Sequence, residues 1–131
     1  MLTDQTITLA KGANFAVFST VLPSGRIQSQ VMWIDTDGEH LLINTELHRQ
    51  KVRNIETDPT ATVTIFDATS SYQYSEVRGT VVDMVRGPEA RAHIDALSQK
   101  YVGSPYKNTI QSERVILKIA PDRVRDVTVA A

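Results

Sequence analysis

Apolar and polar residues alternate along much of the chain, and this pattern predicts β-strands. The alternation is clearest over residues 61–67, where Thr62 and Thr64 separate apolar side chains. A bend is expected at Gly79, because a glycine inside a strand often marks an irregularity in the ladder. The strands predicted in this way are residues 14–21, 27–34, 41–45, 61–67, 72–85, 114–120 and 124–129.

The first three strands follow one another with short turn signals between them. Pro23-Ser24-Gly25 separates the first two, and Asp35-Thr36-Asp37-Gly38 is a strong hairpin signal before the third. Consecutive strands joined by short turns usually pair with each other. The sequence therefore predicts that residues 14–45 form an antiparallel meander.

Three other segments have helical character. Residues 4–11 follow possible capping side chains and stop at Gly12, and residues 51–57 stop at Asp58-Pro59. Gly87-Pro88 opens the longest helix, over residues 89–101. Six or seven strands with one long and two short helices predict a mostly antiparallel barrel in a single domain, residues 1–131.

Composition narrows the class of protein. The 131 residues are 41% hydrophobic, which is enough for one domain with its own core. Basic and acidic residues nearly balance, at 14 and 15, so we expect no nucleic-acid partner. No apolar run approaches the roughly 20 residues of a membrane span, and no signal-peptide pattern opens the chain. The absence of cysteine excludes disulfides and thiolate chemistry and agrees with a cytoplasmic location. The three histidines lack metal-ligand spacing, so no metal site is expected.

Cations are concentrated directly after the strand at 41–45. Arg49, Lys51 and Arg53 occupy alternate positions, so their side chains share a face if the chain stays extended. If a helix begins near Gln50 instead, its free N–H groups add to the same positive region. Arginine and lysine suit phosphate oxygens, and the neighbouring uncharged donors are Asn44, Thr45 and Asn54. Residue types alone leave two interpretations, a phosphate site or a solvated basic stretch.

A family resemblance favours the phosphate site. The segments that carry it are Asn44-Thr45, Arg49-x-Lys51-x-Arg53-Asn54-Ile55 and Asp58-Pro59-x-Ala61. They resemble the split β-barrel flavoproteins, which include pyridoxamine 5′-phosphate oxidases and actinobacterial deazaflavin-dependent reductases. The similarity covers residues 13–82. The chain departs from the oxidases because no Trp-x-x-x-Arg-Leu-x-Pro-like tail follows Trp33, and it is more similar to the branch that uses coenzyme F-420.

This resemblance implies an FMN-binding split barrel of the pyridoxamine phosphate oxidase-like type and a hydride-transfer function. A reduced deazaflavin, coenzyme F-420, would reduce an electron-poor small molecule of the enone, quinone or tetrapyrrole type, with the cofactor carrying the chemistry. No catalytic side chain is therefore implied. The alternatives are FMN in the same fold, a non-catalytic flavin- or tetrapyrrole-binding protein, and an ordinary interaction domain. The family also implies a homodimer with the cofactor at the subunit interface.

The expected cofactor-binding residues come from four segments. Side chains of the second strand would lie beneath the cofactor ring, and those around Lys51 would bind its phosphate. Two tyrosines would stack on the ring or donate a hydroxyl to the substrate. Without a cofactor role, the side chains of the second strand would fill the barrel interior, and the tyrosines would be exposed surface residues. The set is Thr20, Gln28, Gln30, Met32, Asn44, Thr45, Arg49, Lys51, Arg53, Asn54, Tyr72 and Tyr74. Candidate cations for a deazaflavin tail are Lys11, Arg26 and Lys107, if the fold brings them close.

Overall fold

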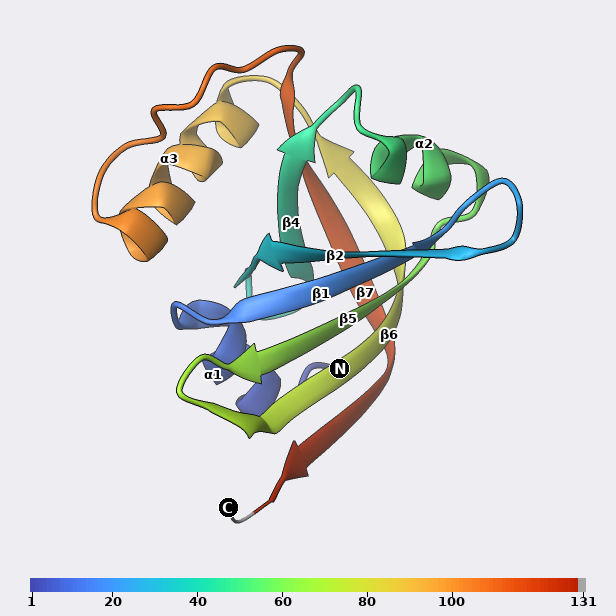
Figure 1. Ribbon diagram of the computed structural model, residues 1–131, viewed down its shortest axis with the longest axis vertical. Coiled ribbons are helices and arrows are strands. Elements are labelled where there is room, and N and C mark those ends of the chain that lie inside the picture. The colour runs from blue at the N-terminus through green and yellow to red at the C-terminus, as the bar shows by residue number, and fades with distance from the viewer. Residues whose placement is uncertain (130–131) are drawn as a thin grey trace.

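A seven-stranded antiparallel sheet forms the centre of the computed structural model, which describes residues 1–129 (Figure 1). The sheet curls into a half barrel with the strand order β2-β1-β5-β6-β7-β4-β3. This confirms the predicted mostly β split barrel. The expected domain boundaries, 1–131, include residues 130 and 131, which lie outside the described residues. The strands are β1 Phe15–Val21, β2 Ile27–Trp33, β3 Asp35–Thr36, β4 Leu41–Glu46, β5 Thr60–Asp67, β6 Ser70–Val85 and β7 Arg114–Thr128.

Alternation along the strands builds the core, because successive side chains point to opposite faces of a sheet. Strand β1 buries Ala16 and Phe18, and its neighbour β5 buries Val63 and Ile65. Strand β4 differs, since all six of its residues are buried. A strand that is covered on both faces needs an additional layer, and a helix supplies it.

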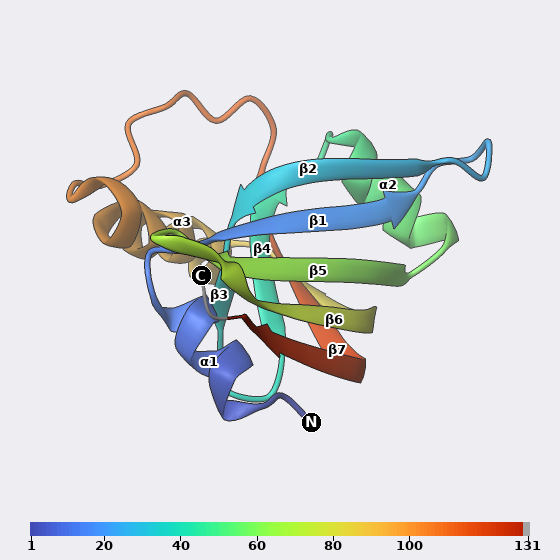
Figure 2. The same ribbon diagram turned by 60° about the horizontal axis from the view of Figure 1, so that its bottom comes forward.

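Three helices cover the open parts of the half barrel. They are α1 Asp4–Lys11, α2 Gln50–Thr57 and α3 Pro88–Val102. Figures 1 and 2 place α1 and α2 at opposite ends of the curled sheet, and both helices contribute apolar side chains to its main core. Helix α3 packs on β4 and β7 through Ala90, which contacts Leu42 and Ile116. The three predicted helices are confirmed.

The predicted meander is wrong at its third strand. Strands β1 and β2 pair as expected, but β4 pairs with β7 and with the two-residue β3, and not with β2. The hairpin signal at residues 35–38 joins β3 to β4, and it redirects the chain across the barrel. Strand β4 finds an equally apolar partner in residues 115–119 of β7, so burial outweighs proximity in the sequence.

The last two predicted strands form one. Strand β7 runs without interruption from Arg114 to Thr128 and pairs with β6 along its length. Pro121 does not end it, because the pairing shifts register at Gly79 and absorbs the irregularity there. A Cβ atom at position 79 would lie only 2.5 Å from the Ala120 carbonyl oxygen, so the close approach of the two strands requires glycine.

Candidate functional site

Helix α2 begins immediately beyond the end of β4, with only residues 47–49 between them. The backbone N–H groups of Leu47 and Arg49 donate to Glu113 and Glu46, which hold this short connection against the start of β7. Arg49 is the N-cap residue, and its side chain makes no capping hydrogen bond. The positive end of α2 therefore lies at the end of β4, as in the helical alternative considered from the sequence.

Lys51 lies in the first turn of α2 and is only 6% exposed. Its Nζ donates to Thr45 Oγ1 at 3.5 Å, and among residues 1–129 no carboxylate oxygen lies within 4.0 Å of it. Burial lowers the pKa of Lys51, and the positive charges of Arg49 and Arg114 lower it further. A buried ammonium with two cationic neighbours and no acidic partner creates a strong local preference for an anion.

Arg114 completes this cationic cluster, and it was not predicted from the sequence. It begins β7 directly opposite Glu46 of β4. Its Nε donates to Asn44 Oδ1 at 2.8 Å, and its Nη1 lies 3.8 Å from Glu46 Oε2. The guanidinium also lies over the ring of Tyr106, 5.1 Å from its centroid. Asn44 and Arg114 are 70 residues apart in the sequence. The sequence around Arg114 predicts only the first residue of a strand, so no local signal indicated its place in the cluster.

The carboxylate of Glu46 balances only part of this charge. Burial alone raises the pKa of Glu46, but hydrogen bonds from the backbone N–H groups of Ser112 and Gln111, with Arg114 and His48 nearby, lower it overall. The ionised carboxylate thus holds the segment before β7 in place and pairs with Arg114. Lys51 has no equivalent partner among the described residues.

The three cations of the sequence motif do not share one face. Arg53 is exposed on α2, where its guanidinium donates to the His48 carbonyl and to Gln50 Oε1, each at 2.6 Å. Helical geometry turns residues 51 and 53 to different sides. The structure therefore groups Arg49 and Lys51 with Arg114, and a role for Arg53 stays a prediction.

Three other predicted residues meet beneath α2. Asn54 is buried, and its Nδ2 donates to Thr20 Oγ1 at 3.0 Å and to Gln28 Oε1 at 3.1 Å. These bonds fasten α2 to β1 and β2. The amide of Asn54 is thus occupied by protein partners, and its oxygen accepts a bond from Gln50 Nε2. The cluster positions the helix that carries Lys51.

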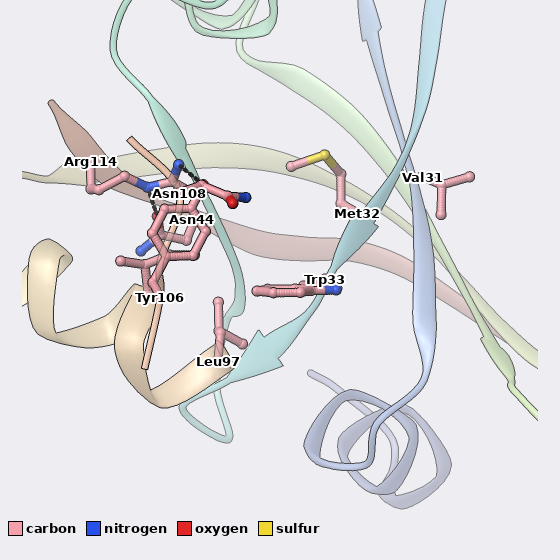
Figure 3. Close-up of a pocket in the computed structure, with 9 residues that line it drawn as sticks. Val31, Met32, Trp33, Asn44, Leu97, Tyr106, Asn108 and Arg114 are labelled. Atoms are coloured by element: carbon pink, nitrogen blue, oxygen red, sulfur yellow. Dashed lines mark hydrogen bonds between the residues drawn. The ribbon is translucent and has the colours of Figure 1, made fainter. Parts of the chain in front are cut away.

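A pocket of about 270 Å³ lies next to the cationic cluster, between β2, β4, α3 and the segment before β7 (Figure 3). Met32 and Trp33 extend from β2 toward Asn44, Tyr106 and Arg114. Arg114 lines the pocket and also lies near Lys51, so it connects the pocket with the cationic cluster.

The indole of Trp33 is held rigidly in the wall of this pocket. It stacks on Tyr101 of α3 with a centroid distance of 5.0 Å and an interplanar angle of 3°. The Tyr101 hydroxyl in turn donates to the Asn14 carbonyl and accepts from the Ile34 N–H group. A fixed aromatic plane beside a polar edge suits a planar ligand.

The tyrosines predicted for the site lie elsewhere in this chain. Tyr72 is 59% exposed near the start of β6, and the Tyr74 carbonyl accepts a hydrogen bond from Gln5 of α1. Helix α1 lies at the end of the half barrel opposite to α2 (Figure 1). Gln30 is half-buried on the same face of β2 as Gln28. Cofactor roles for these residues stay predictions.

Only one of the candidate tail cations lies beside the pocket. Lys107 lines a shallow depression that shares Trp33, Tyr106 and Asn108 with the main pocket. The Nζ atom of Lys11 instead lies 3.6 Å from Asp35 Oδ1. Arg26 is exposed in the turn between β1 and β2.

The curled antiparallel sheet, with helices at its ends and a cationic cluster beyond β4, is a split β-barrel. The chain belongs to the pyridoxamine 5′-phosphate oxidase family, whose sequence profile matches residues 2–128. No curated protein sequence matches it significantly. None of the helices within residues 1–129 is long and apolar enough to cross a membrane.

Solved structures support the same family. An F-420 reductase is 30% identical, with a TM-score of 0.83 over 95% of this chain and 98% of the other. A conserved hypothetical protein from Mycobacterium tuberculosis is 20% identical, with a TM-score of 0.74 over 98% and 86%. A pyridoxamine 5′-phosphate oxidase-related, FMN-binding protein from Nostoc punctiforme is 16% identical, with a TM-score of 0.63 over 92% and 77%. The last two show the fold alone.

Proposed function

We propose that this protein is an oxidoreductase that uses reduced coenzyme F-420 as hydride donor to an electron-poor small molecule. The observation that carries the proposal is the buried Lys51 ammonium, which has Arg49 and Arg114 as neighbours and no acidic partner within residues 1–129. A phosphate would neutralise this cluster and accept hydrogen bonds from the free N–H groups of α2. The ribityl phosphate of a flavin-type cofactor is the anion that the family favours.

The pocket beside the cluster suits the planar part of such a cofactor or its acceptor. Met32 and Trp33 supply apolar surface that excludes water, and Asn44 and Tyr106 supply polar groups at the opposite wall. When bound, the deazaflavin would supply the hydride, and the protein would hold and orient it. An acceptor of the enone, quinone or tetrapyrrole type fits the mixture of aromatic and cationic surface.

FMN is the alternative cofactor. Both molecules carry a phosphate on a ribityl chain, so the cationic cluster does not distinguish them. The 30% identity with an F-420 reductase favours deazaflavin, whereas the FMN-binding relative shares 16%. Lys107 at the edge of the pocket also suits the acidic tail that deazaflavin has and FMN lacks.

Titration of the purified protein with oxidised coenzyme F-420, FMN and haem tests the proposal. Binding of deazaflavin alone, at micromolar or tighter affinity, is expected. If the purified protein carries stoichiometric FMN, FMN and not deazaflavin is its cofactor. Binding without reduction of any acceptor would favour a non-catalytic flavin- or tetrapyrrole-binding protein.

Substitutions test the phosphate assignment. Lys51→Ala and Arg49→Ala should each weaken cofactor binding at least tenfold, or about 1.4 kcal/mol. Arg91→Ala is the control, because Arg91 is an exposed arginine of α3 that pairs with Asp95. Unchanged affinity in both site variants would remove the assignment.

We also propose a homodimer that buries the outer face of β1 and β2. The register sets Val17 opposite Val31 and Val21 opposite Ile27, so these four side chains share one face. Ile27 is 61% exposed and Val31 67% exposed. Exposed apolar patches mark interaction sites, and two-fold dimers are the commonest soluble oligomers, so we infer a second copy as the partner of this face. Cytoplasmic location and the absence of a nucleic-acid partner stay predictions from composition.

A further inference from the structure

The side-chain amide of Asn44 has only one possible orientation. Its oxygen accepts from Arg114 Nε at 2.8 Å, and its nitrogen donates to the Ala90 carbonyl at 3.0 Å. A guanidinium nitrogen can only donate and a carbonyl can only accept, so exchanging the two amide atoms would break both bonds. Asn44 is 4% exposed, so water does not replace these partners freely.

This orientation fixes the protonation state of His93 on α3. The Asn44 Nδ2 group also points at His93 Nδ1, 3.0 Å away, and Nδ1 must therefore be the acceptor. The other ring nitrogen, Nε2, lies 3.0 Å from Asp35 Oδ2 and donates to it. His93 is thus held as the neutral tautomer with its proton on Nε2.

The Asp35 end of this chain of contacts is negatively charged at neutral pH. Burial alone raises the pKa of Asp35, but bonds from His93 and the Thr36 N–H group, together with the charge of Lys11, lower it overall. Lys100 and Tyr101 of α3 also lie within electrostatic range of this carboxylate. The ionised Asp35 accepts the Nε2 proton of His93, and the bond from Asn44 requires Nδ1 to be unprotonated.

We propose that His93 is a positioning residue: together with the Ala90 carbonyl, its Nδ1 atom holds the Asn44 amide in the orientation that binds Arg114 in the anion site. Without this acceptor, the Asn44 amide nitrogen would keep only the Ala90 carbonyl as its partner, and Arg114 would be held less firmly. The part that concerns anion binding rests on the proposed function, whereas the link from His93 to Arg114 does not.

Nitrogen-15 NMR of the full protein without added cofactor tests the link. At about pH 8 the His93 ring should show the Nε2–H tautomer, and Arg114 Nε–H should give a protected signal. An Nδ1–H tautomer of His93, or an Arg114 signal that stays unchanged in His93→Gln, would overturn the proposal.

Matched variants separate positioning from packing. His93→Asn places an amide oxygen near the position of Nδ1 and should keep the Arg114 signal. His93→Gln and His93→Leu lack that acceptor and should lose it. If His93→Leu fails to fold, the comparison of the Asn and Gln variants still decides the matter.

Binding of oxidised coenzyme F-420 and of FMN forms the second arm. His93→Gln should weaken binding at least about threefold at neutral pH, the scale of one lost hydrogen bond. His93→Asn should bind like the wild type. Equal affinity in all variants would refute the role in binding. If neither ligand binds the wild type, the proposed function fails, but the NMR experiment still tests whether His93 positions Arg114 through Asn44.

Discussion

Among single residues, Lys51 most clearly opposes the stability of the fold, because its buried charge costs free energy. An ammonium that is 6% exposed loses hydration, and its charged neighbours Arg49 and Arg114 repel it. An uncharged side chain at this position would avoid both costs. The proposed anion site would account for the retention of the charge, because a bound anion compensates a buried cation.

Lys51→Met should therefore raise stability while it weakens anion binding. The expected gain at neutral pH is on the order of 1 kcal/mol, since a buried charge without a partner is replaced by an apolar chain. Thermal unfolding at low phosphate concentration measures it. A variant that is less stable than the wild type would show that Lys51 supports the fold.

The same lysine predicts a pH dependence of stability. Its pKa in the folded protein lies below the ordinary value of 10.5, so the unfolded chain binds more protons between these two values. The stability of the wild type relative to Lys51→Met should consequently recover as pH rises toward 10.5. Urea unfolding of both proteins across this range checks the sign, and a gap that widens instead would contradict it.

The motif and the site overlap only partly at this scale. The sequence predicted Arg49 and Lys51 as phosphate ligands, and both lie in the cationic cluster. Arg53 was included by its alternate spacing, which a helix does not preserve. Arg114 was missed because nothing in its own neighbourhood distinguishes it from other strand residues.

At the scale of elements, the long pair β6–β7 depends on one glycine. Gly79 lies where the register shifts, and the two backbones approach too closely for a side chain. The pairing extends along β7 from Thr128 to Ile116, so this one position lies within the longest strand pair of the sheet.

Gly79→Ala should destabilise the protein by roughly 1–3 kcal/mol, as overpacking of a close contact does. The added Cβ would lie 2.5 Å from the Ala120 carbonyl oxygen and 2.6 Å from the Ile119 side chain. Val82→Ala on the same strand is the control, because Val82 is 55% exposed. Chemical denaturation compares the unfolding midpoints of the two variants. Equal midpoints would contradict the prediction, because they would mean that β6 and β7 accommodate the added methyl group without loss of stability.

The whole molecule leaves one face of its sheet uncovered. Apolar side chains of β1 and β2 lie opposite each other on the outer surface, while the alternate residues of β1 are buried and those of β2 are half-buried. Successive side chains of a strand point to opposite faces of the sheet, so the residues that point into the barrel determine which residues lie on its outer face. A homodimer would give the outer face the environment that its residues favour.

Val31→Glu should disrupt the proposed dimer. The wild type should behave in light scattering as twice the 14.5 kDa chain, and the variant should shift toward the single-chain mass as charge enters an apolar interface. Val82→Glu, an exposed valine of β6, should leave the mass unchanged. A monomeric wild type, or a dimeric Val31→Glu protein, would contradict the assignment of this face.

Local sequence patterns predicted most of the strands, the three helices and the cationic segment that follows residues 41–45. These features are local, since alternation, capping residues and proline act within a few neighbouring positions. Only the tertiary structure decided that β4 pairs with β7, and this pairing brings Arg114 to Asn44 and Lys51 across 70 residues of chain. Strand neighbours depend on the burial of distant apolar faces, which no local pattern records, so the cluster of Arg49, Lys51 and Arg114 is complete only in the folded protein.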